Sequence, residues 1–537
     1  MNFQTCLVAM GRQTRTKIIE EFAESTTAHG VSNVLKARGV EKLLWLLVMI
    51  IVWIVLIWQC SDLIRQYCSH PSTYTIANVP MPSVEYPAIT LCNQNPTRMT
   101  CAMTNFKTLL AGLYDIHKWS EPDFFAKKTY EIMFRYPEVV AQCGRRMKYM
   151  EYECTFGGKA CNESGVQYKD WRHSRYGMCA TYTVDTKVQI PGKPSKLSLR
   201  TFVEQSEYTF AIGSVVGMQV QIHDRNIVPF PEESGFMVSA GSISTLAFEK
   251  SVKTLLGSPH TKCVKPTEMS ETNLYADLNN TVDGKRKLYT QAACFRTCIL
   301  DLYFAANGCV LPEFVTREMA IKRYGPNVKQ CYDNHQTEKW VAKQLSAGKC
   351  NDICAESCST VDYVGDISVT SFPGLPYAVK HLLNDPEMKL LADLLMKLGQ
   401  PIMELLIKFM ERNGHDDFRH HYFKHRQDVK QNDNLLLADA IRAKDDLSDG
   451  MLFLLQSIAF DRLHKFFINN MLELNVFYRT ISTTYTNETA VMQAWDLASG
   501  IGGLLGLFVG MSILTLVEML LLLKNLCCNC IHKTEEE

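Results

Sequence analysis

The amino-acid sequence predicts an α+β membrane protein, in which two transmembrane helices flank a large disulfide-rich, strand-rich extracellular domain with peripheral helices. Three observations lead to this fold class. An apolar run lies near each end of the chain, and most of the 20 cysteines lie between these two runs. The segment between them also contains short apolar stretches interrupted by prolines, which favour extended strands over helices.

The two apolar runs have the length of membrane helices. Residues 501–523 form a run of 23 residues, enough to cross a hydrocarbon core of about 30 Å. The run at 43–58 reaches spanning length when residues 60–64 are added, and Lys42 and Trp58 bracket it as interfacial anchors do. It lies too far from the N-terminus for a cleaved signal peptide. The predicted segments are a cytosolic N-terminus at 1–41, a first span at 42–64, an extracellular domain at 65–493, a second span at 494–524 and a cytosolic C-terminus at 525–537.

Cysteines and sequons indicate which side of the membrane the large segment occupies. Fifteen cysteines fall between Cys68 and Cys358, a density typical of disulfide-linked domains in an oxidising space. Three N-x-S/T sequons, at Asn162, Asn279 and Asn487, lie between the spans and are the predicted glycosylation sites. We therefore expect a plasma-membrane protein whose large segment is extracellular and whose two termini are cytosolic.

Composition and motifs exclude several function classes. The net charge is zero and no basic stripe is interleaved with aromatic residues, so nucleic acid is not an expected partner. No H-E-x-x-H, G-x-S-x-G or P-loop motif occurs, which favours a receptor or a channel over an enzyme and predicts no cofactor. His421 and His425 are spaced by four and would suit a metal on a helix, but a solvated polar surface is the preferred interpretation, so no metal site is predicted.

Between the spans, periodicity predicts strands followed by helices. Strand patterns occur at 74–91, 218–224 and 472–479, and the last of these leads towards the second span. Apolar residues at i, i+3, i+4 and i+7 predict a helix over about 382–413, and a second over 450–470. We expect one compact extracellular domain.

The second span combines glycines with a carboxylate. Gly502, Gly506 and Gly510 are spaced by four, so they form either a helix-packing face or a pore-facing stripe. At Gly510-Met511-Ser512 the helix can unwind, and exposed carbonyls there can replace part of an ion's hydration shell. Glu518 would attract cations if it faces the same lumen; otherwise it snorkels to the inner interface. Two spans cannot enclose a pore, so a channel would require a small ring of subunits.

The cysteines of the large segment cluster as C-x3-C and C-x3-C-x3-C. Such spacings occur in zinc sites, but an extracellular location favours disulfides. An odd cysteine remains unless Cys60 pairs with Cys68.

Several motifs together resemble the degenerin/epithelial sodium channel superfamily. GIGGLLGLFVGMSILTLVE at 500–518 resembles that family's second span, and TTAHGVSNV at 26–34 carries its His-Gly pair, His29 and Gly30. YPAITLCNQN, YGMCATY, GMQVQIHD, QAACFRTC and CAESC are similar to further blocks, so the resemblance covers most of the chain.

This resemblance implies a trimer with a hand-shaped extracellular domain, a sodium-preferring pore and block by amiloride. It identifies Gly510, Met511 and Ser512 with the selectivity filter, and His29 with Gly30 as gating residues. The pore-lining residues would be Asp496, Ser499, Gly500, Gly503 and Glu518. The implied disulfides are Cys92–Cys179, Cys154–Cys161, Cys263–Cys358, Cys294–Cys354, Cys298–Cys350, Cys309–Cys331 and an additional pair, Cys101–Cys143.

Departures from the acid-sensing members point to a different stimulus. Those members carry an aspartate before I-G-G, where this chain has Gly500, so Asp496 one turn earlier would have to supply the outer carboxylate. They also carry an Asp-Glu pair where this chain has Asn226 and Ile227, and paired carboxylates with raised pKa values can sense mild acid. We therefore expect a homotrimer in the lipid bilayer that conducts sodium ions and opens with a short amidated neuropeptide of the FMRFamide type.

Several alternatives stay open. A proton-gated channel, a constitutively open epithelial-type channel, a mechanically gated channel and a two-span cell-surface receptor share this topology. A peptide with one Arg and two Phe would need an aromatic pocket with an acid, for which Asp123, Phe124 and Phe125 are candidates; an aromatic core is the other interpretation. Palmitoylation is one interpretation of Cys527, Cys528 and Cys530, and reduced thiols are the other.

Overall fold

The computed structural model describes residues 22, 26–105, 124–208, 215–278, 287–331, 339–341, 343–344, 347–372, 465 and 468–522. The chain divides into two compact units. The first, called here the helical unit, comprises Met1–Thr75, Leu255–Lys262 and Asn487–Glu537. The second, the sheet unit, comprises Ile76–Thr254 and Cys263–Thr486.

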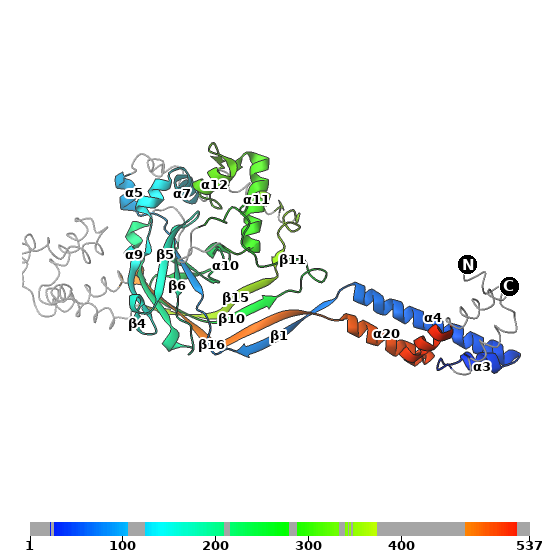
Figure 1. Cartoon of the computed structure of the whole chain (residues 1–537). Helices are drawn as coiled ribbons and strands as arrows, with labels where there is room; N and C mark the ends of the chain where they lie inside the picture. Colours follow the sequence, from blue (N-terminus) through cyan, green and yellow to red (C-terminus); the bar gives the residue numbers. More distant parts are fainter. Residues whose placement is uncertain are drawn as a thin grey trace, which may run out of the picture. The chain divides into compact units, whose positions relative to one another are not determined.

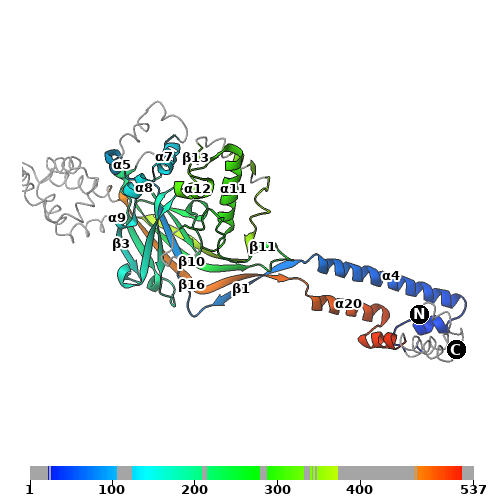
Figure 2. The ribbon, with the colours of Figure 1, turned by 45° about the horizontal axis from the view of Figure 1, so that its top comes forward.

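The helical unit contains the two apolar segments. The helix α4 (Val40–Cys68) is long and apolar enough to cross a membrane, and a bent pair of helices, Ala494–Val509 and Ile513–Leu522, gives a second span if both halves are counted as one. The first of these halves is α20. The predicted spans at 42–64 and 494–524 fall on these helices. Figures 1 and 2 show α4 and α20 lying side by side, with the short helix α3 (Val31–Lys36) near the start of α4.

A five-stranded antiparallel sheet forms one layer of the sheet unit. Its order is β5-β6-β2-β8-β9, with bounds β2 (Ala88–Asn93), β5 (Val166–His173), β6 (Gly177–Val184), β8 (Gly217–His223) and β9 (Phe236–Ser239). The central strand β2 is buried on both faces, and its polar Thr90 is hydrogen-bonded to Thr181 and His223 of the two neighbouring strands. Cys92 of β2 lies directly opposite Cys179 of β6, and the two form a disulfide.

A seven-stranded sheet forms the other layer. Its order is β15-β10-β16-β7-β3-β4, and β1 also pairs with β16. The bounds are β1 (Ser72–Pro80), β3 (Glu151–Phe156), β4 (Lys159–Ala160), β7 (Leu197–Phe202), β10 (Ser242–Thr254), β15 (Ser359–Ser371) and β16 (Met471–Ala490). With 20 residues, β16 is much longer than the predicted strand at 472–479, because β7, β10 and β1 each pair with it. Two short parallel pairs, β11 (Cys263–Val264) with β14 (Glu356–Ser357) and β12 (Cys309–Val310) with β13 (Lys329–Gln330), complete the strands of the described residues.

Aromatic side chains form the centre of the core of the sheet unit. The rings of Tyr86, Phe248 and Tyr478 contact one another, with centroid distances between 4.3 and 6.1 Å. All three side chains are fully buried. Their polar atoms are satisfied by the backbone, since the Tyr86 hydroxyl donates to Val476 O (2.6 Å) and the Tyr478 hydroxyl donates to Glu85 O (2.8 Å). These contacts tie β16 to the segment that precedes β2.

Helices lie at one end of the sheets, as Figure 1 shows for α5, α7, α11 and α12. Helices of the sheet unit within the described residues include α5 (Met99–Asn105), α7 (Phe124–Arg135), α8 (Pro137–Cys143), α9 (Met147–Met150), α10 (Pro231–Ser234), α11 (Gln291–Asn307) and α12 (Arg317–Tyr324). The predicted helix at 382–413 lies outside the described residues, as does most of the one at 450–470.

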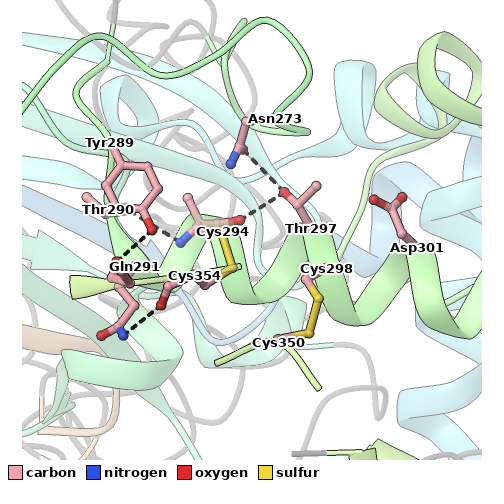
Figure 3. The surroundings of a disulfide bond; sticks show 12 residues. Asn273, Tyr289, Thr290, Gln291, Cys294, Thr297, Cys298, Asp301, Cys350 and Cys354 are labelled. Atoms are coloured by element: carbon pink, nitrogen blue, oxygen red, sulfur yellow. Dashed lines mark hydrogen bonds between the residues drawn. A yellow bond between two sulfur atoms is a disulfide. The ribbon is translucent and has the colours of Figure 1, made fainter. Parts of the chain in front are cut away.

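Two disulfides anchor α11. Cys294 and Cys298 are four residues apart, so they lie on one face of the helix and bond Cys354 and Cys350 (Figure 3). The hydroxyl of Thr290 accepts from Ala293 N (3.3 Å) and caps the helix. In all, seven disulfides occur among the described residues, and their pairs are those that the family resemblance implied: Cys92–Cys179, Cys101–Cys143, Cys154–Cys161, Cys263–Cys358, Cys294–Cys354, Cys298–Cys350 and Cys309–Cys331.

Cys60 and Cys68 do not bond each other; both are free among the described residues. They lie eight residues apart on α4, so about 12 Å of helix separates them. A disulfide needs Cα atoms within about 7 Å. The pairing that sequence analysis considered is therefore wrong for this fold.

A buried charge cluster joins α11 to α10 and β5. The Arg296 guanidinium contacts Glu232 (2.5 Å) and Glu233 (2.6 Å) and lies over the Phe230 ring at 4.2 Å. His173 Nε2 lies 3.3 Å from the other Glu232 oxygen. Burial opposes ionisation of Glu232, yet His173 and Arg296 hold the pKa of this carboxyl well below its usual range. The positive charge of Arg296 and the carboxylates of Glu232 and Glu233 therefore compensate each other in this contact, which His173 extends to a third element.

The segment after β8 lacks the paired carboxylates of acid-sensing proteins. Asn226 N donates to the Asp224 side chain (2.8 Å), and Asn226 O accepts from Leu288 N (2.8 Å). Just before it, His223 is buried between Thr90 (2.8 Å) and Asp224 O (2.7 Å). Burial, together with a smaller effect of the charge of Lys287, lowers the pKa of His223 from 6.5 to about 4.

His223 is expected to make the fold less stable in acid. The unfolded chain binds a proton at His223 below about pH 6.5, whereas the folded chain does so only below about pH 4, so stability is lost as the pH falls between these values. At pH 5 this amounts to about 2 kcal/mol. Thermal unfolding of the purified full chain at pH 7 and pH 5 measures it. His223→Gln should show a smaller pH-dependent drop in the unfolding midpoint, and an unchanged drop would contradict the assignment.

Candidate functional site

The second apolar helix is broken at Gly510. The helix α20 ends at Val509, Gly510 adopts a left-handed conformation (φ 70°), and the chain resumes as a helix at Ile513–Leu522 after a bend of 71°. Glycine permits this backbone at no steric cost. Gly510 N donates to Gly506 O (3.0 Å) and Met511 N to Leu505 O (3.2 Å), which closes the end of the helix. The break lies at the three residues, Gly510 to Ser512, where the sequence predicted local unwinding.

A hydroxyl pair starts the second half of the helix. Thr515 Oγ1 accepts from Ser512 N at 2.9 Å, and Ser512 Oγ accepts from Thr515 N at 3.4 Å. This reciprocal arrangement corresponds to a capping box. Ser512 is exposed, whereas Thr515 is completely buried. Sequence analysis missed Thr515, although the S-x-x-T spacing directly after a helix break is the signal for it.

The segment at 26–30 packs against this break. His29 N donates to Val509 O at 2.7 Å, and the hydroxyls of Thr27 and Thr515 lie 2.6 Å apart. Ala28 is buried with Val509 and Met511 in a small apolar cluster. The His-Gly pair and the glycine-rich helix, which lie at opposite ends of the sequence, thus form one structure.

Glu518 is bonded to the same segment. Its carboxylate accepts from the Thr26 hydroxyl (3.1 Å) and from Thr27 N (3.3 Å). A costly charge in an apolar helix therefore has polar partners inside the chain. Thr26 and Thr27 were missed by sequence analysis; the need of a carboxylate in an apolar helix for hydrogen-bond donors is the only signal that pointed to such residues.

Two glycines lie where residues 26–30 meet the helix break and α4, at positions with little room for a Cβ atom. A Cβ at Gly510 would lie 2.6 Å from the His29 ring. A Cβ at Gly30, which has φ 87°, would lie 2.4 Å from the sulfur of Met49 on α4. A side chain at Gly510 would push His29 away from the break, and one at Gly30 would be strained by the positive φ and would displace the Met49 side chain.

The remaining glycines of α20 differ in their surroundings. A Cβ at Gly500 would lie 2.7 Å from Leu63 of α4, so this is where the two helices approach closely. Among the described residues, no atom lies within 4 Å of a Cβ built at Gly502 or Gly503, and at Gly506 only Met511 O does, at 3.9 Å. Gly502 and Gly506 therefore do not pack α20 against another described part of this chain, and Gly500 points to α4.

At its N-terminal end, α20 begins with a carboxylate cap. Asp496 accepts from Gln493 N at 2.8 Å, and the two residues form a capping box. Asp496, Ser499, Gly503 and Gly510 follow one another at spacings of three, four and seven, so they lie along one face of the helix. Asp496 and Ser499 are exposed.

Other predicted sites lie apart from the broken helix. Asn162 is exposed in a short helical turn at Cys161–Glu163, and Asn487 is half-buried in β16, where its carbonyl accepts from the Thr75 hydroxyl. Several predicted sites lie outside the described residues: Asn279, Asp123, the side chains of Phe124 and Phe125, the histidines at 415–425, and Cys527, Cys528 and Cys530.

Comparisons with known proteins agree with these features. The family described as amiloride-sensitive sodium channel matches residues 22–522. The FMRFamide-activated amiloride-sensitive sodium channel of Cornu aspersum is 22% identical over 94% of this chain and 82% of its own length. Acid-sensing ion channel 4 of Rattus norvegicus is 24% identical over 66% of this chain, and the epithelial sodium channel subunit alpha of Xenopus laevis is 21% identical over 55%. These two matches span 64% and 59% of the relatives' own lengths.

The contact between residues 26–30 and the helix break is expected to permit an engineered disulfide. Thr27→Cys with Thr515→Cys should cross-link within the chain under mild oxidant, because the two native hydroxyls lie 2.6 Å apart. The variants carry serine at Cys527, Cys528 and Cys530, and mass spectrometry of the joined peptides detects the bond. The control pair, Thr27→Cys with Ile513→Cys, uses a neighbouring exposed position. Equal cross-linking of both pairs, or none, would contradict the contact.

Proposed function

Because this chain belongs to the amiloride-sensitive sodium channel family, we propose that it forms a sodium-selective, amiloride-sensitive cation channel in the plasma membrane that a short amidated neuropeptide opens. Both termini are cytosolic in this proposal, and the sheet unit is the extracellular, ligand-sensing part. The helix break at Gly510–Ser512 is the observation that carries the permeation part of the proposal.

The break supports a selectivity filter of backbone oxygens. Irregular backbone at membrane depth is tolerated only where protein buries it or where it lines a water-filled path. Met511 is largely buried inside the chain and Ser512 is exposed. We therefore assign ion coordination to carbonyl groups of Gly510–Ser512 and to the Ser512 hydroxyl, with Met511 holding the loop in place.

Acidic and small residues support a cation pathway above and below this point. Asp496, Ser499 and Gly503 share a helix face with Gly510, and small residues on that face permit a narrow passage. Glu518 keeps a carboxylate below the break, half-exposed and bonded to Thr26 and Thr27. A negative charge at each end of a pore raises the local concentration of cations. Gly500 is assigned to packing against α4 instead.

An oligomer is required, and a homotrimer is the proposed one. Two apolar segments from one chain cannot surround a pore. The glycine face at Gly502, Gly503 and Gly506 has space within this chain, and small residues let helices from separate chains approach closely in lipid. The trimer itself comes from the family resemblance.

Peptide gating rests on the relative that aligns over most of the chain. The FMRFamide-activated channel of Cornu aspersum matches 94% of this sequence, and the chain lacks the carboxylate pair at Asn226 and Ile227. The agonist site is proposed near Asp123, Phe124 and Phe125, where an acid and two rings suit a peptide that carries arginine and phenylalanine. His29 and Gly30 are proposed to act in gating, because they hold the cytosolic side of the helix break.

Two alternative modes of opening are compatible with the same proposed pore. Acid-sensing and epithelial relatives also match the chain, so proton gating and constitutive conduction are the competing modes of opening. A cell-surface receptor without a pore is the non-channel alternative.

Current through the chain expressed alone tests the function. Short amidated peptides should evoke a sodium current that amiloride blocks, whereas a drop in pH without peptide should not. Whole-cell recording with ion substitution measures both, and surface labelling confirms that the protein reaches the membrane.

The other outcomes separate the alternatives. An acid-evoked current would replace peptide gating by proton gating, and a current without any stimulus would indicate a constitutive channel. A labelled surface protein that passes no current under any stimulus would contradict a homomeric channel.

Ser512 is expected to determine selectivity. Ser512→Leu removes the exposed hydroxyl and places a bulky side chain beside the carbonyls, so the sodium-to-potassium permeability ratio should fall by about tenfold, the equivalent of one lost hydrogen-bonding group at about 1.4 kcal/mol. Reversal potentials in mixed sodium and potassium solutions measure the ratio. Leu507→Ile is the matched control, since Leu507 is 78% exposed and precedes the break. A ratio that stays at the wild-type value in Ser512→Leu would remove this residue from the filter.

A further inference from the structure

Two histidines meet where α4 passes into β1. His70 follows the end of α4, and His260 lies in the segment Leu255–Lys262, which belongs to the same helical unit. Their ring centroids are 5.4 Å apart, with the planes at 76°. We propose that these two imidazoles bind one divalent transition-metal ion of the Zn²⁺ type. This site is independent of the proposed channel function.

The spacing of the rings suits a shared ion. Zn–N bonds of about 2.0–2.1 Å in a tetrahedral arrangement hold the centroids of two bound imidazoles about 5 Å apart. The observed 5.4 Å is close to this value. Edge-to-face packing of two rings gives similar centroid distances, so the hydrogen bonding of the ring nitrogens, and not the distance alone, points to an ion.

The hydrogen bond of His260 selects the tautomer that a metal requires. His260 Nδ1 lies 2.9 Å from the backbone oxygen of His70. A carbonyl oxygen only accepts, so Nδ1 carries a proton, and in the neutral imidazole Nε2 then keeps its lone pair. Histidines that ligate metals are usually oriented in this way, with the second nitrogen donating to a carbonyl or carboxylate.

The backbone holds His70 in an unusual conformation. His70 has φ 49°, a left-handed value that few residues other than glycine adopt. His70 N donates to Tyr67 O (3.0 Å), which turns the chain sharply after α4. A left-handed residue directly after the C-cap is a common way to end a helix, and histidine tolerates it, so this turn fixes the direction in which the His70 side chain leaves the backbone.

A buried carboxylate fixes the two segments relative to each other. Glu488 of β16 accepts from the Ser72 hydroxyl (2.5 Å), the Leu256 amide (2.9 Å) and the Thr261 hydroxyl. Ser72 lies two residues after His70, and Thr261 directly follows His260. Glu488 is therefore a positioning residue, which preorganises the two ligands and adds negative charge near a bound cation.

The ion would retain open coordination positions. Among the described residues, no group of three or more His, Cys, Asp or Glu side chains is arranged to hold a metal. Two imidazoles would thus be the protein ligands, and water would occupy the other positions. A bound ion would link the residues that follow α4 to the segment Leu255–Lys262. Glu488, which lies shortly before the second apolar helix, contacts both through Ser72, Leu256 and Thr261.

Counting bound zinc on the purified full chain tests the proposal. All variants carry Cys68→Ser, because this exposed thiol is two residues from His70 and thiolates are zinc ligands in their own right. Asparagine replaces each histidine. At 260 it keeps a donor for His70 O, and at 70 it tolerates the left-handed conformation. Equilibrium dialysis against buffered free Zn²⁺ between 1 and 100 µM, about the range expected for a site with few protein ligands, measures ions per chain.

Each single variant, His70→Asn or His260→Asn, should lose about one bound ion per chain, and the double variant should lose no more than either. Unchanged binding would overturn the proposal, and so would additive losses, which indicate two separate sites. A matched control replaces His415, His420, His421 and His425 with asparagine and should keep the ion. Loss of the ion in this control alone would also overturn the proposal.

A second measurement on the unsubstituted chain avoids any effect of mutation on folding. Carbethoxylation of histidines, followed by mass spectrometry, reports the accessibility of each imidazole. Zn²⁺ should protect His70 and His260 together, with the same half-maximal concentration. Protection of neither, or protection at clearly different concentrations, would overturn the shared site.

Discussion

The structure of the second apolar helix depends on hydrogen bonds from a segment that lies almost five hundred residues away in sequence. A helix break exposes backbone groups, and a hydrocarbon environment offers them no solvent partners. Here His29 N meets Val509 O, the hydroxyl of Thr27 meets that of Thr515, and Glu518 receives two donors from residues 26–27. The TTAHG segment at 26–30 has small side chains and several hydrogen-bond donors. It can therefore fit between α4 and the break and supply partners to the groups exposed there. A bulky or apolar segment would leave both the carbonyls and the carboxylate without partners.

The same chemistry recurs along the chain that leads into this helix. Glu488 in β16, Asp496 in the first turn of α20 and Glu518 below the break each accept hydrogen bonds from backbone amides or hydroxyls where a regular element ends or begins. Each acid therefore has a structural role at a point where the chain changes direction. This constrains mutational analysis, because removing such a carboxylate changes local geometry as well as charge. Replacing the carboxylate by an amide or a hydroxyl group keeps a hydrogen-bond acceptor but removes the charge. Such variants distinguish the effect on geometry from the effect on charge.

Sequence alone located the local features of this fold and missed the long-range ones. Proline-punctuated apolar runs correctly predicted β1 and β2, alternation predicted β8, and the glycine beside a hydroxyl predicted the helix break. The disulfide pairs followed from family resemblance, since spacing leaves the partners of Cys294 and Cys298 open. The bonds of Thr26 to Glu518, and of Arg296 to Glu232 and Glu233, join residues with no pattern in common, so periodicity cannot reveal them. The antiparallel pair of β10 and β15, whose strands lie far apart in sequence, was missed because its serines and threonines dilute the alternation on which strand prediction relies.

The five glycines between Gly500 and Gly510 have separate physical causes, although they form one sequence motif. Gly510 is needed for a positive φ and for the proximity of the His29 ring, and Gly500 for the approach of Leu63. These two are explained within a single chain. Gly502, Gly503 and Gly506 are not, and glycine weakens a helix by about 1 kcal/mol relative to alanine. A helix that retains such residues on an open face gains from them when another helix packs closely there, as proposed for Gly502 and Gly506, or when they leave a passage open, as proposed for Gly503. In a membrane the favourable candidate is the same face of a neighbouring copy, because small residues allow backbones to contact directly. The glycine pattern is therefore an argument for assembly that stands apart from family membership.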